Sequence, residues 1–169
     1  MSIIVNCAEK TISFNGKTYS CRIGRGGYID GSKGREGDEK TPLGDYVIRF
    51  GFYRPDRLSA PLPTALNMIA LTADDGWCDG ANDPAYNRFV KTSNPGSHEK
   101  LWRSDGAYDV VLVISHNDSP PEPNCGSAVF IHIAQPDDRE TLGCVALTPD
   151  VMVKLLAVVY PEIMIRIKA

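Results

Sequence analysis

The sequence predicts a mainly β fold in which short strands are joined by turns and by long loops. The chain has 15 Gly and 12 Pro in 169 residues, and both residue types mark turns between short strands. Several β-prone runs are separated by charged or Asn-Gly segments, whereas a single stretch near the C-terminal end keeps helical spacing. These observations argue against an all-helical bundle.

Three β-prone runs open the chain, at residues 3–6, 11–14 and 18–23. Asn15-Gly16, between two of these runs, is a strong signal for a two-residue hairpin turn. Residues 24–40 are rich in glycine and charge but lack the Gly-Lys-Ser/Thr ending of a phosphate-binding loop, so we interpret them as an exposed loop. A turn at 41–44 then leads into a strand at 45–53.

The middle of the chain, residues 54–107, shows little periodicity and is expected to form long loops with one strand near 66–71. His98 and Trp102 in this segment are candidates for a helix that covers a cleft. Long ordered loops in a compact protein often carry function.

The strongest strand signals are the apolar runs at 108–115 and 127–134, which suit central strands covered on both faces. Thr148 as an N-cap, followed by Pro149, predicts an amphipathic helix that runs to about Tyr160. Alternating apolar residues then predict a last strand with one buried face, formed by Ile163, Ile165 and Ile167.

Composition and charge narrow the classes of function. The net charge of -3 supplies no basic surface for phosphate contacts, so no nucleic-acid partner is expected. The first residues lack a basic segment followed by a long apolar run, so neither a signal peptide nor membrane insertion is expected. No repeat or change in composition marks a boundary, and residues 1–169 are expected to form a single, monomeric domain.

The cysteines form an odd set without a CxxC pair: Cys7, Cys21, Cys78, Cys125 and Cys144. This pattern argues against both a disulfide scaffold and a zinc ribbon. The irregular spacing of the cysteines and histidines likewise argues against a metal site, and no cofactor is expected. At least one thiol should be free, and its surroundings decide whether it is reactive.

His132 and Cys144 are the residues best suited to form a catalytic pair. His132 lies in an apolar run, where a ring needs either a hydrogen bond, as in a core histidine, or a function. A thiol needs a neighbouring base to become nucleophilic, so a Cys/His pair is the minimal machinery for acyl transfer. Gly143 allows a tight turn in which backbone N–H groups can face a developing oxyanion.

The stretch IHIAQPDDRETLGCVAL resembles the active-site signature of the L,D-transpeptidase catalytic-domain family, also called YkuD. That signature is a histidine after an apolar strand, then Ser or Thr, a variable residue, Gly and Cys. Four residues match it position by position: His132, Thr141, Gly143 and Cys144. KTPLGDY is similar to the family's Thr-Pro-x-Gly turn, and segments such as GWCDG and SHNDSPPEP resemble a proteobacterial branch with a TxGCVAL motif.

The resemblance implies a β-sandwich or half-barrel with one amphipathic helix after the catalytic cysteine, long loops and a cradle for peptide. It implies that Cys144 attacks a peptidoglycan stem tetrapeptide, the donor, to form a thioester, with His132 as acid and base. The amine of a second stem peptide would be the acceptor. A role in cell wall biogenesis and cell shape, in the cell envelope or periplasm, follows from the same resemblance, although the absence of a visible export signal leaves the cytoplasm open.

Further residues are candidates for binding substrate. Thr141 belongs to the signature, and Arg88, within Tyr86-Asn87-Arg88, could hold a stem-peptide carboxylate or could be an ordinary surface arginine. Two residues that end a strand, His116 and Asn117, are expected either to line the same cleft or to cap that strand.

Two positions depart from the family pattern. Leu142 stands where many members have a second histidine, and Ala146 stands where they have Asn or Arg. These departures leave two alternatives open beside transpeptidation: a carboxypeptidase or amidase that hydrolyses stem peptides on the same fold, and a noncatalytic peptidoglycan-binding module. Product analysis separates the first from a transferase, and thiol reactivity tests the second, because an idle buried cysteine reacts slowly.

Overall fold

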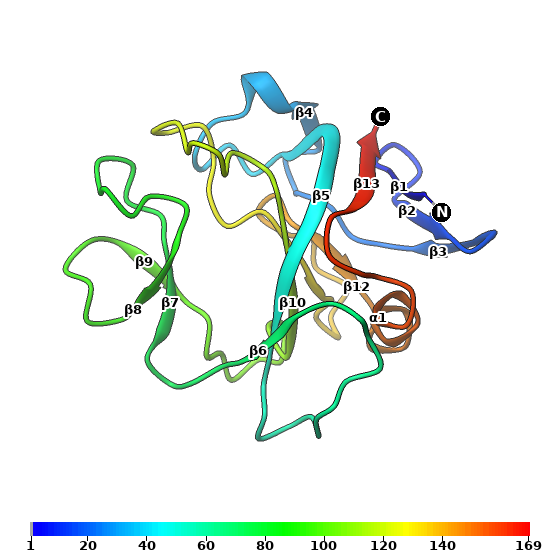
Figure 1. Cartoon of the computed structure of the whole chain (residues 1–169). Coiled ribbons are helices and arrows are strands. Elements are labelled where there is room, and N and C mark those ends of the chain that lie inside the picture. Colours follow the sequence, from blue (N-terminus) through cyan, green and yellow to red (C-terminus); the bar gives the residue numbers. More distant parts are fainter. Residues whose placement is uncertain (1) are drawn as a thin grey trace.

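A computed structural model describes residues 2–169 (Figure 1). Its strands are β1 (Ile3–Asn6), β2 (Thr11–Phe14), β3 (Lys17–Ser20), β4 (Tyr28–Asp30), β5 (Thr41–Tyr53), β6 (Met68–Ala70), β7 (Asp75–Cys78), β8 (Phe89–Lys91), β9 (His98–Lys100), β10 (Val110–Ile114), β11 (Phe130–Ile133), β12 (Val145–Leu147) and β13 (Ile163–Lys168). The helical elements are the 3₁₀ helix η1 (Gly31–Lys33) and the α-helix α1 (Pro149–Leu156). The fold is mainly β with a single α-helix among the described residues, which confirms the predicted class.

The larger sheet has ten strands and curls almost into a barrel. Its order is β12-β11-β10-β5-β13-β1-β2-β3, with β4 and β6 also paired to β5. The thirteen-residue β5 joins β10 on one side to β13 on the other and crosses the centre of Figure 1. Arg22, just after β3, exchanges backbone hydrogen bonds of 2.8 and 2.9 Å with Ala146 in β12. This pair links the two ends of the sheet and nearly closes the barrel.

Strand β10 divides the apolar core into two clusters, one on each face of the sheet. Val110, Leu112 and Ile114 belong to the larger cluster, whereas Val111 and Val113 belong to the smaller one. This division follows from the period-two alternation of side chains along a strand. All of β10 is buried, which confirms the prediction of a central strand covered on both faces. Helix α1 covers the larger cluster with Val151, Met152, Leu155 and Leu156.

A second, three-stranded sheet of order β8-β7-β9 lies to one side of the larger sheet (Figure 1). It is built from the segment that we expected to be mostly loop, and β9 also shows that the expectation of a helix at His98 was wrong. Its strands are only three or four residues long, too short for periodicity to reveal them. Aromatic packing attaches this sheet, because the Trp77 ring lies 5.1 Å from Phe130 in β11 and 6.4 Å from Phe52 in β5.

Several boundaries in the first part of the chain differ from expectation. β3 ends at Ser20, and β5 begins at Thr41, so the expected turn at 41–44 is part of a strand. It is extended because Thr41, Pro42 and Leu43 pair in parallel with β4, which itself lies in the segment that we expected to be a loop. The hairpin at Asn15-Gly16 is confirmed, since both residues have positive φ as a type I′ turn requires.

The C-terminal elements are close to the prediction. Helix α1 begins at Pro149 and ends at Leu156 instead of continuing to Tyr160, because the chain enters a turn before Pro161. β13 alternates strictly between buried and exposed residues, as its sequence pattern predicts. Within residues 2–169, no helix has both the length and the apolar character needed to cross a membrane.

Candidate active site

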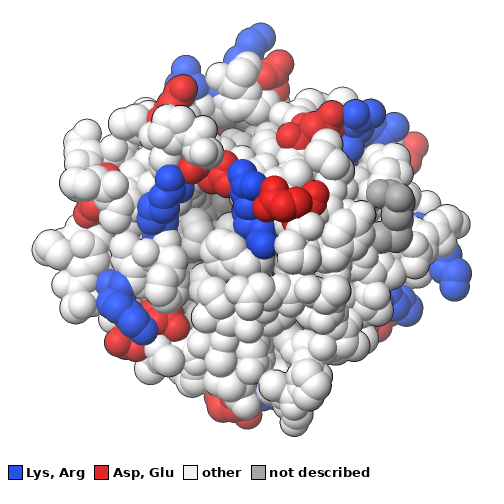
Figure 2. All heavy atoms as spheres, in the orientation of Figure 1, with Lys and Arg blue, Asp and Glu red and all other residues white. Residues whose placement is uncertain are grey.

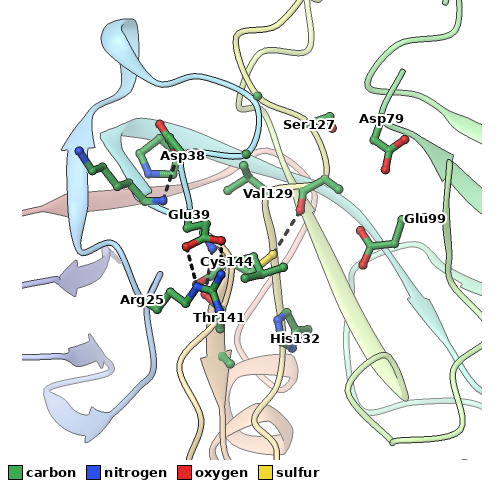
Figure 3. Close-up of a pocket in the computed structure, with 18 of the residues that line it drawn as sticks. Arg25, Asp38, Glu39, Asp79, Glu99, Ser127, Val129, His132, Thr141 and Cys144 are labelled. Atoms are coloured by element: carbon green, nitrogen blue, oxygen red, sulfur yellow. Dashed lines mark hydrogen bonds and ion pairs between the residues drawn. The ribbon is translucent and has the colours of Figure 1, made fainter. Parts of the chain in front are cut away.

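A cavity of about 790 Å³ lies between the larger sheet, the smaller sheet and the loop that precedes β5. Its wall includes Cys144 and His132. Figure 3 shows the two residues in one part of the cavity, with Glu99 pointing towards them and Asp79 pointing towards Glu99. On the face seen in Figure 2, acidic and basic side chains gather around a hollow. The cavity therefore joins the predicted catalytic pair to a charged surface.

Parallel pairing of β11 with β12 places the cysteine and the histidine on one face of the sheet. Ile131 pairs with Val145, and Cys144 comes directly before that position. The backbone N–H of Phe130 donates to Cys144 Sγ at 3.3 Å, so the thiol lies beside Phe130. Because alternate residues of a strand share a face, His132 lies on the same side as Phe130. The loop between the two strands thus explains the spacing of the pair in sequence.

The Cys144 thiol is partly buried and bonded to the backbone. Its Sγ donates to the carbonyl oxygen of Ala128 at 3.2 Å and accepts the Phe130 N–H. Burial raises the pKa of the Cys144 thiol to about 12, and the hydrogen bond from Phe130 opposes that rise only in part. The resting thiol is therefore neutral at physiological pH.

The His132 ring is also neutral and is held in one orientation. Its Nδ1 lies 2.9 Å from the carbonyl oxygen of Ile133, which fixes the tautomer with hydrogen on Nδ1 and leaves the Nε2 lone pair as the base. Burial lowers the pKa of His132 to about 4, although the hydrogen bond to Ile133 raises it. The His132 and Tyr108 rings pack in a T-shaped arrangement, with ring centres 5.3 Å apart.

The turn before Cys144 depends on Gly143 and on two threonines. Gly143 has φ +134°, and a Cβ there would lie 3.0 Å from the carbonyl oxygen of Lys40. Thr141 Oγ1 accepts the N–H of Gly143 at 3.1 Å and donates to the carbonyl oxygen of Cys144 at 2.7 Å. Buried Thr41 donates to the carbonyl oxygen of Gly143 at 2.9 Å. Thr141 lines the cavity, and its hydroxyl shapes the turn.

His116 also lines the cavity. Its side chain is 6% exposed and its Nδ1 has no hydrogen-bond partner in residues 2–169. Burial lowers the pKa of His116 to about 4. Its ring packs edge-on against Tyr46 and closely against Gly126, where a Cβ would come within 2.9 Å of it.

The other predicted substrate residues lie outside this cavity wall. Arg88 lines a smaller pocket of about 240 Å³ on β7, β10 and β11. The Asn87 amide accepts from Trp77 Nε1 and the Ala128 N–H, and it donates to the carbonyl oxygens of His116 and Asn117. Asn87 therefore connects the smaller sheet to the loop after β10.

Tyr86 and Asn117 also organise loops. The Tyr86 hydroxyl donates to Glu36 and accepts from the N–H of Gly126. The Asn117 side chain bonds backbone atoms of Glu122 and Gly126, which shapes the loop after β10. Their hydrogen bonds support a structural role.

Sequence reasoning missed the polar group that the smaller sheet and the segment after it bring to the cavity: Asp79, Glu99, Arg103, Asp105 and Tyr108. The Tyr108 hydroxyl donates to Glu99 Oε1 at 2.6 Å, and the Arg103 guanidinium lies over the Tyr108 ring. Arg103 also pairs with Asp105. The four charged residues lie in a segment without periodicity, so only the fold shows that they are neighbours of one another and of Tyr108.

The two departures from the family pattern differ in exposure. Leu142 lies at the cavity and is 70% exposed, so its side chain is free to contact a ligand. Ala146 is 1% exposed, pairs with His132 across the ladder and also lines the cavity. No three His, Cys, Asp or Glu side chains of residues 2–169 are arranged to hold a metal ion.

The fold and the site define a mainly β protein with a cysteine and a histidine in one wall of a charged cavity. The chain belongs to the family of L,D-transpeptidase catalytic domains, YkuD, whose family model matches residues 1–166. This confirms the family that the motifs indicated. No match was found among curated proteins.

Similar solved structures come from several bacteria. Bd1075 of Bdellovibrio bacteriovorus is 16% identical, with a TM-score of 0.48, over 98% of this chain and 46% of that one. L,D-transpeptidase 1 of Mycobacterium tuberculosis is 14% identical, with a TM-score of 0.44, over 99% of this chain and 60% of that one. The helical cell shape determining protein Pgp2 of Campylobacter jejuni is 13% identical, with a TM-score of 0.45, over 98% of this chain and 46% of that one. The chain thus spans about half the length of these proteins, and the family assignment rests on the family model.

Proposed function

We propose that this protein is a cysteine-dependent acyl transferase that acts on peptidoglycan stem tetrapeptides. The observation that carries this proposal is the placement of Cys144 and His132 on one face of two adjacent strands, within one cavity. Membership of the L,D-transpeptidase family supports the kind of substrate. The following steps are what the residues of this site would do in that reaction.

In the first half of the reaction, Cys144 Sγ attacks the carbonyl carbon of the amide between the third residue, typically diaminopimelate, and the terminal D-Ala. The thiol proton passes to His132 Nε2, and the imidazolium then donates it to the amine of the departing D-Ala. A thioester remains on Cys144. In the second half, the amine of another stem peptide attacks the thioester, its proton passes to His132 and then to the thiolate, and a cross-link forms between the third residues.

Because Cys144 and His132 are both neutral before substrate binds, the thiol proton should pass to His132 as Cys144 attacks the amide. Burial disfavours the thiolate and the imidazolium individually, as the pKa values of about 12 for Cys144 and about 4 for His132 indicate. Opposite charges that form together in a low-dielectric site stabilise each other, so a concerted transfer costs less than either ionisation alone. Backbone N–H groups around Cys144 are the proposed oxyanion donors, and the N–H of Gly143 can serve only when its bond to Thr141 opens.

A noncatalytic peptidoglycan-binding module is the second candidate, because a raised thiol pKa is what an idle buried cysteine would show. A hydrolase on the same fold differs from the transferase only in using water as the acceptor. We further propose that the protein acts as a monomer in the cell envelope, where peptidoglycan lies. Thr141 and His116 are the predicted substrate contacts that line the cavity.

The proposed function is tested by incubating the protein with disaccharide tetrapeptide and analysing the products by mass spectrometry. A cross-linked dimer with release of D-Ala is the expected result, whereas monomeric tripeptide would identify a carboxypeptidase. Cys144→Ala should abolish either product. Cys125→Ala is the matched control, because Cys125 also lines the cavity and should be dispensable. No Cys144-dependent product would overturn the proposal and favour a binding module.

A further inference from the structure

The smaller sheet presents two carboxylates to the cavity on the face that it packs against the larger sheet. Trp77 in β7 pairs with Glu99 in β9, and directly opposed residues of an antiparallel pair share a face. Asp79 follows β7 two residues after Trp77, so the period of two places it on that face as well. Trp77 packs on Phe130, the neighbour of Cys144, and thereby directs both carboxylates towards the candidate active site (Figure 3).

These carboxylates are only partly neutralised by the protein. Glu99 accepts the Tyr108 hydroxyl and lies 3.5 Å from Arg103, but Arg103 also binds Asp105. Asp79 forms no ion pair with a described residue, and its buried Oδ1 has no hydrogen-bond partner in residues 2–169. Burial raises the pKa of Glu99, and the carboxylates of Asp79 and Glu36 add to that rise. A cation bound between them would relieve this unfavourable charge.

Besides Asp79, three further residues of the same cavity carry unpartnered polar atoms, which mark the cavity as a ligand site independently of the two carboxylates. In residues 2–169, four buried side-chain atoms lack a hydrogen-bond partner, on Asp79, His116, Ser127 and Gln135. All four residues line this cavity, and His116 is more than nine-tenths buried. Since buried polar groups are normally paired, their concentration in one cavity indicates that a polar ligand completes their hydrogen bonds.

We infer that Asp79 and Glu99 bind a primary ammonium group of the substrate, carried by the side chain of a diamino acid. A primary ammonium has three N–H donors that can reach separate carboxylate oxygens, which suits two carboxylates from neighbouring strands. This inference rests on the proposed function, and it assigns these two residues the selection of stem peptides with a free side-chain amine. That amine belongs either to the donor peptide or to the acceptor.

Binding to the Cys144→Ala protein tests the inference without requiring catalysis. Calorimetric titration would compare the diaminopimelate-containing tripeptide with the same peptide acetylated on its side-chain amine. The free-amine peptide should bind about tenfold more tightly, because a hydrogen bond to a charged group raises the binding affinity by a factor of about ten or more. Adding Asp79→Asn or Glu99→Gln should remove that preference. Glu140→Gln is the matched control, since Glu140 lines the cavity but pairs with Lys10.

Equal affinity for the two peptides, no measurable binding of either, or a preference that survives both substitutions would overturn the inference. A protein that binds the free-amine peptide through Asp79 and Glu99 but releases no D-Ala would support the inference and overturn the proposed reaction. The two failures are therefore distinguishable.

Turnover separates the two sources of the amine. A tetrapeptide acetylated on its side-chain amine can serve only as donor. It leaves the thioester without an acceptor, so D-Ala release is compared in the first turnover, in which D-Ala departs as the thioester forms. If the carboxylates hold the donor amine, the wild-type protein should release D-Ala from this peptide about tenfold more slowly than from the free-amine peptide. If they hold the acceptor amine, D-Ala release should be unchanged and Asp79→Asn should lower only dimer formation. Unchanged release together with unchanged dimer formation would overturn the inference.

Discussion

At the scale of single residues, the site depends on backbone geometry as much as on the reactive side chains. Cys144 is held by the carbonyl oxygen of Ala128 and the N–H of Phe130, and Ala128 itself has a positive φ of 52°. His132 is oriented by the carbonyl oxygen next to it in the chain. The reactive atoms therefore take their positions from the main chain of β11 and of the loops beside it.

Gly143→Ala should lower both stability and activity. Its φ of +134° is unfavourable for alanine, and the added Cβ would press on the carbonyl oxygen of Lys40, so we expect a loss of about 1–3 kcal/mol. The turn before Cys144 would shift with it, and D-Ala release should fall at least about tenfold.

Gly16→Ala is the control for the backbone effect, because Gly16 also has positive φ but has open space around it. Urea unfolding and a turnover assay would compare the two variants. Equal losses of stability with full activity in Gly143→Ala would show that the turn does not position the nucleophile.

At the scale of secondary structure, connections between elements hold the site together. Thr41 at the start of β5 accepts the N–H of Gly24 and donates to the carbonyl oxygen of Gly143, each at 2.9 Å. Asn87 joins the smaller sheet to the loops that precede β11. The cavity wall is thus composed of segments that are far apart in sequence.

Thr41→Val should destabilise the protein by about 1–3 kcal/mol, because it leaves a buried N–H and a buried carbonyl oxygen without partners at nearly constant volume. Thr18→Val on exposed β3 is the control and should change the free energy of unfolding by less than about 0.5 kcal/mol. Urea titration measures both, and a Thr41 variant as stable as the control would contradict this role.

Asn87→Ala should destabilise the protein by about 2 kcal/mol or more, because the four groups that bond the Asn87 amide would lose that hydrogen-bond partner. Thermal unfolding monitored by tryptophan fluorescence is suitable, because Trp77 loses its hydrogen bond. Exposed Asn82→Ala serves as the control. An unchanged melting temperature for Asn87→Ala would show that the smaller sheet is held by aromatic packing alone.

The sequence predicted those elements whose pattern is local. β10, β11 and β13 carry apolar or alternating runs, and the pair His132 and Cys144 followed from chemistry combined with a family signature. β7, β8 and β9 could not be predicted, because strands of three or four residues are stable here only through tertiary contacts such as that of Trp77 with Phe130. Asp79 and Glu99 were missed for the same reason.

At the scale of the whole molecule, two buried histidines make stability depend on pH. Burial lowers the pKa values of His116 and His132 from 6.5 to about 4, so the unfolded chain binds more protons than the folded protein between these values. The free energy of unfolding should therefore fall as the pH is lowered from about 6.5 to about 4, by at most about 3 kcal/mol per histidine.

Urea unfolding at a series of pH values measures this dependence. His116→Gln should make it shallower, because glutamine does not titrate. A wild-type stability that stays constant across the window would contradict the burial of neutral histidines.

The measurement that tests the central claim most directly is the intact mass of the protein after brief incubation with disaccharide tetrapeptide and acid quenching. The account predicts a covalent adduct on Cys144, heavier by the mass of the tetrapeptide muropeptide less D-Ala, which is absent from Cys144→Ala and retained in Cys125→Ala. Products that form without an adduct on Cys144, or an adduct that persists in Cys144→Ala, would contradict it.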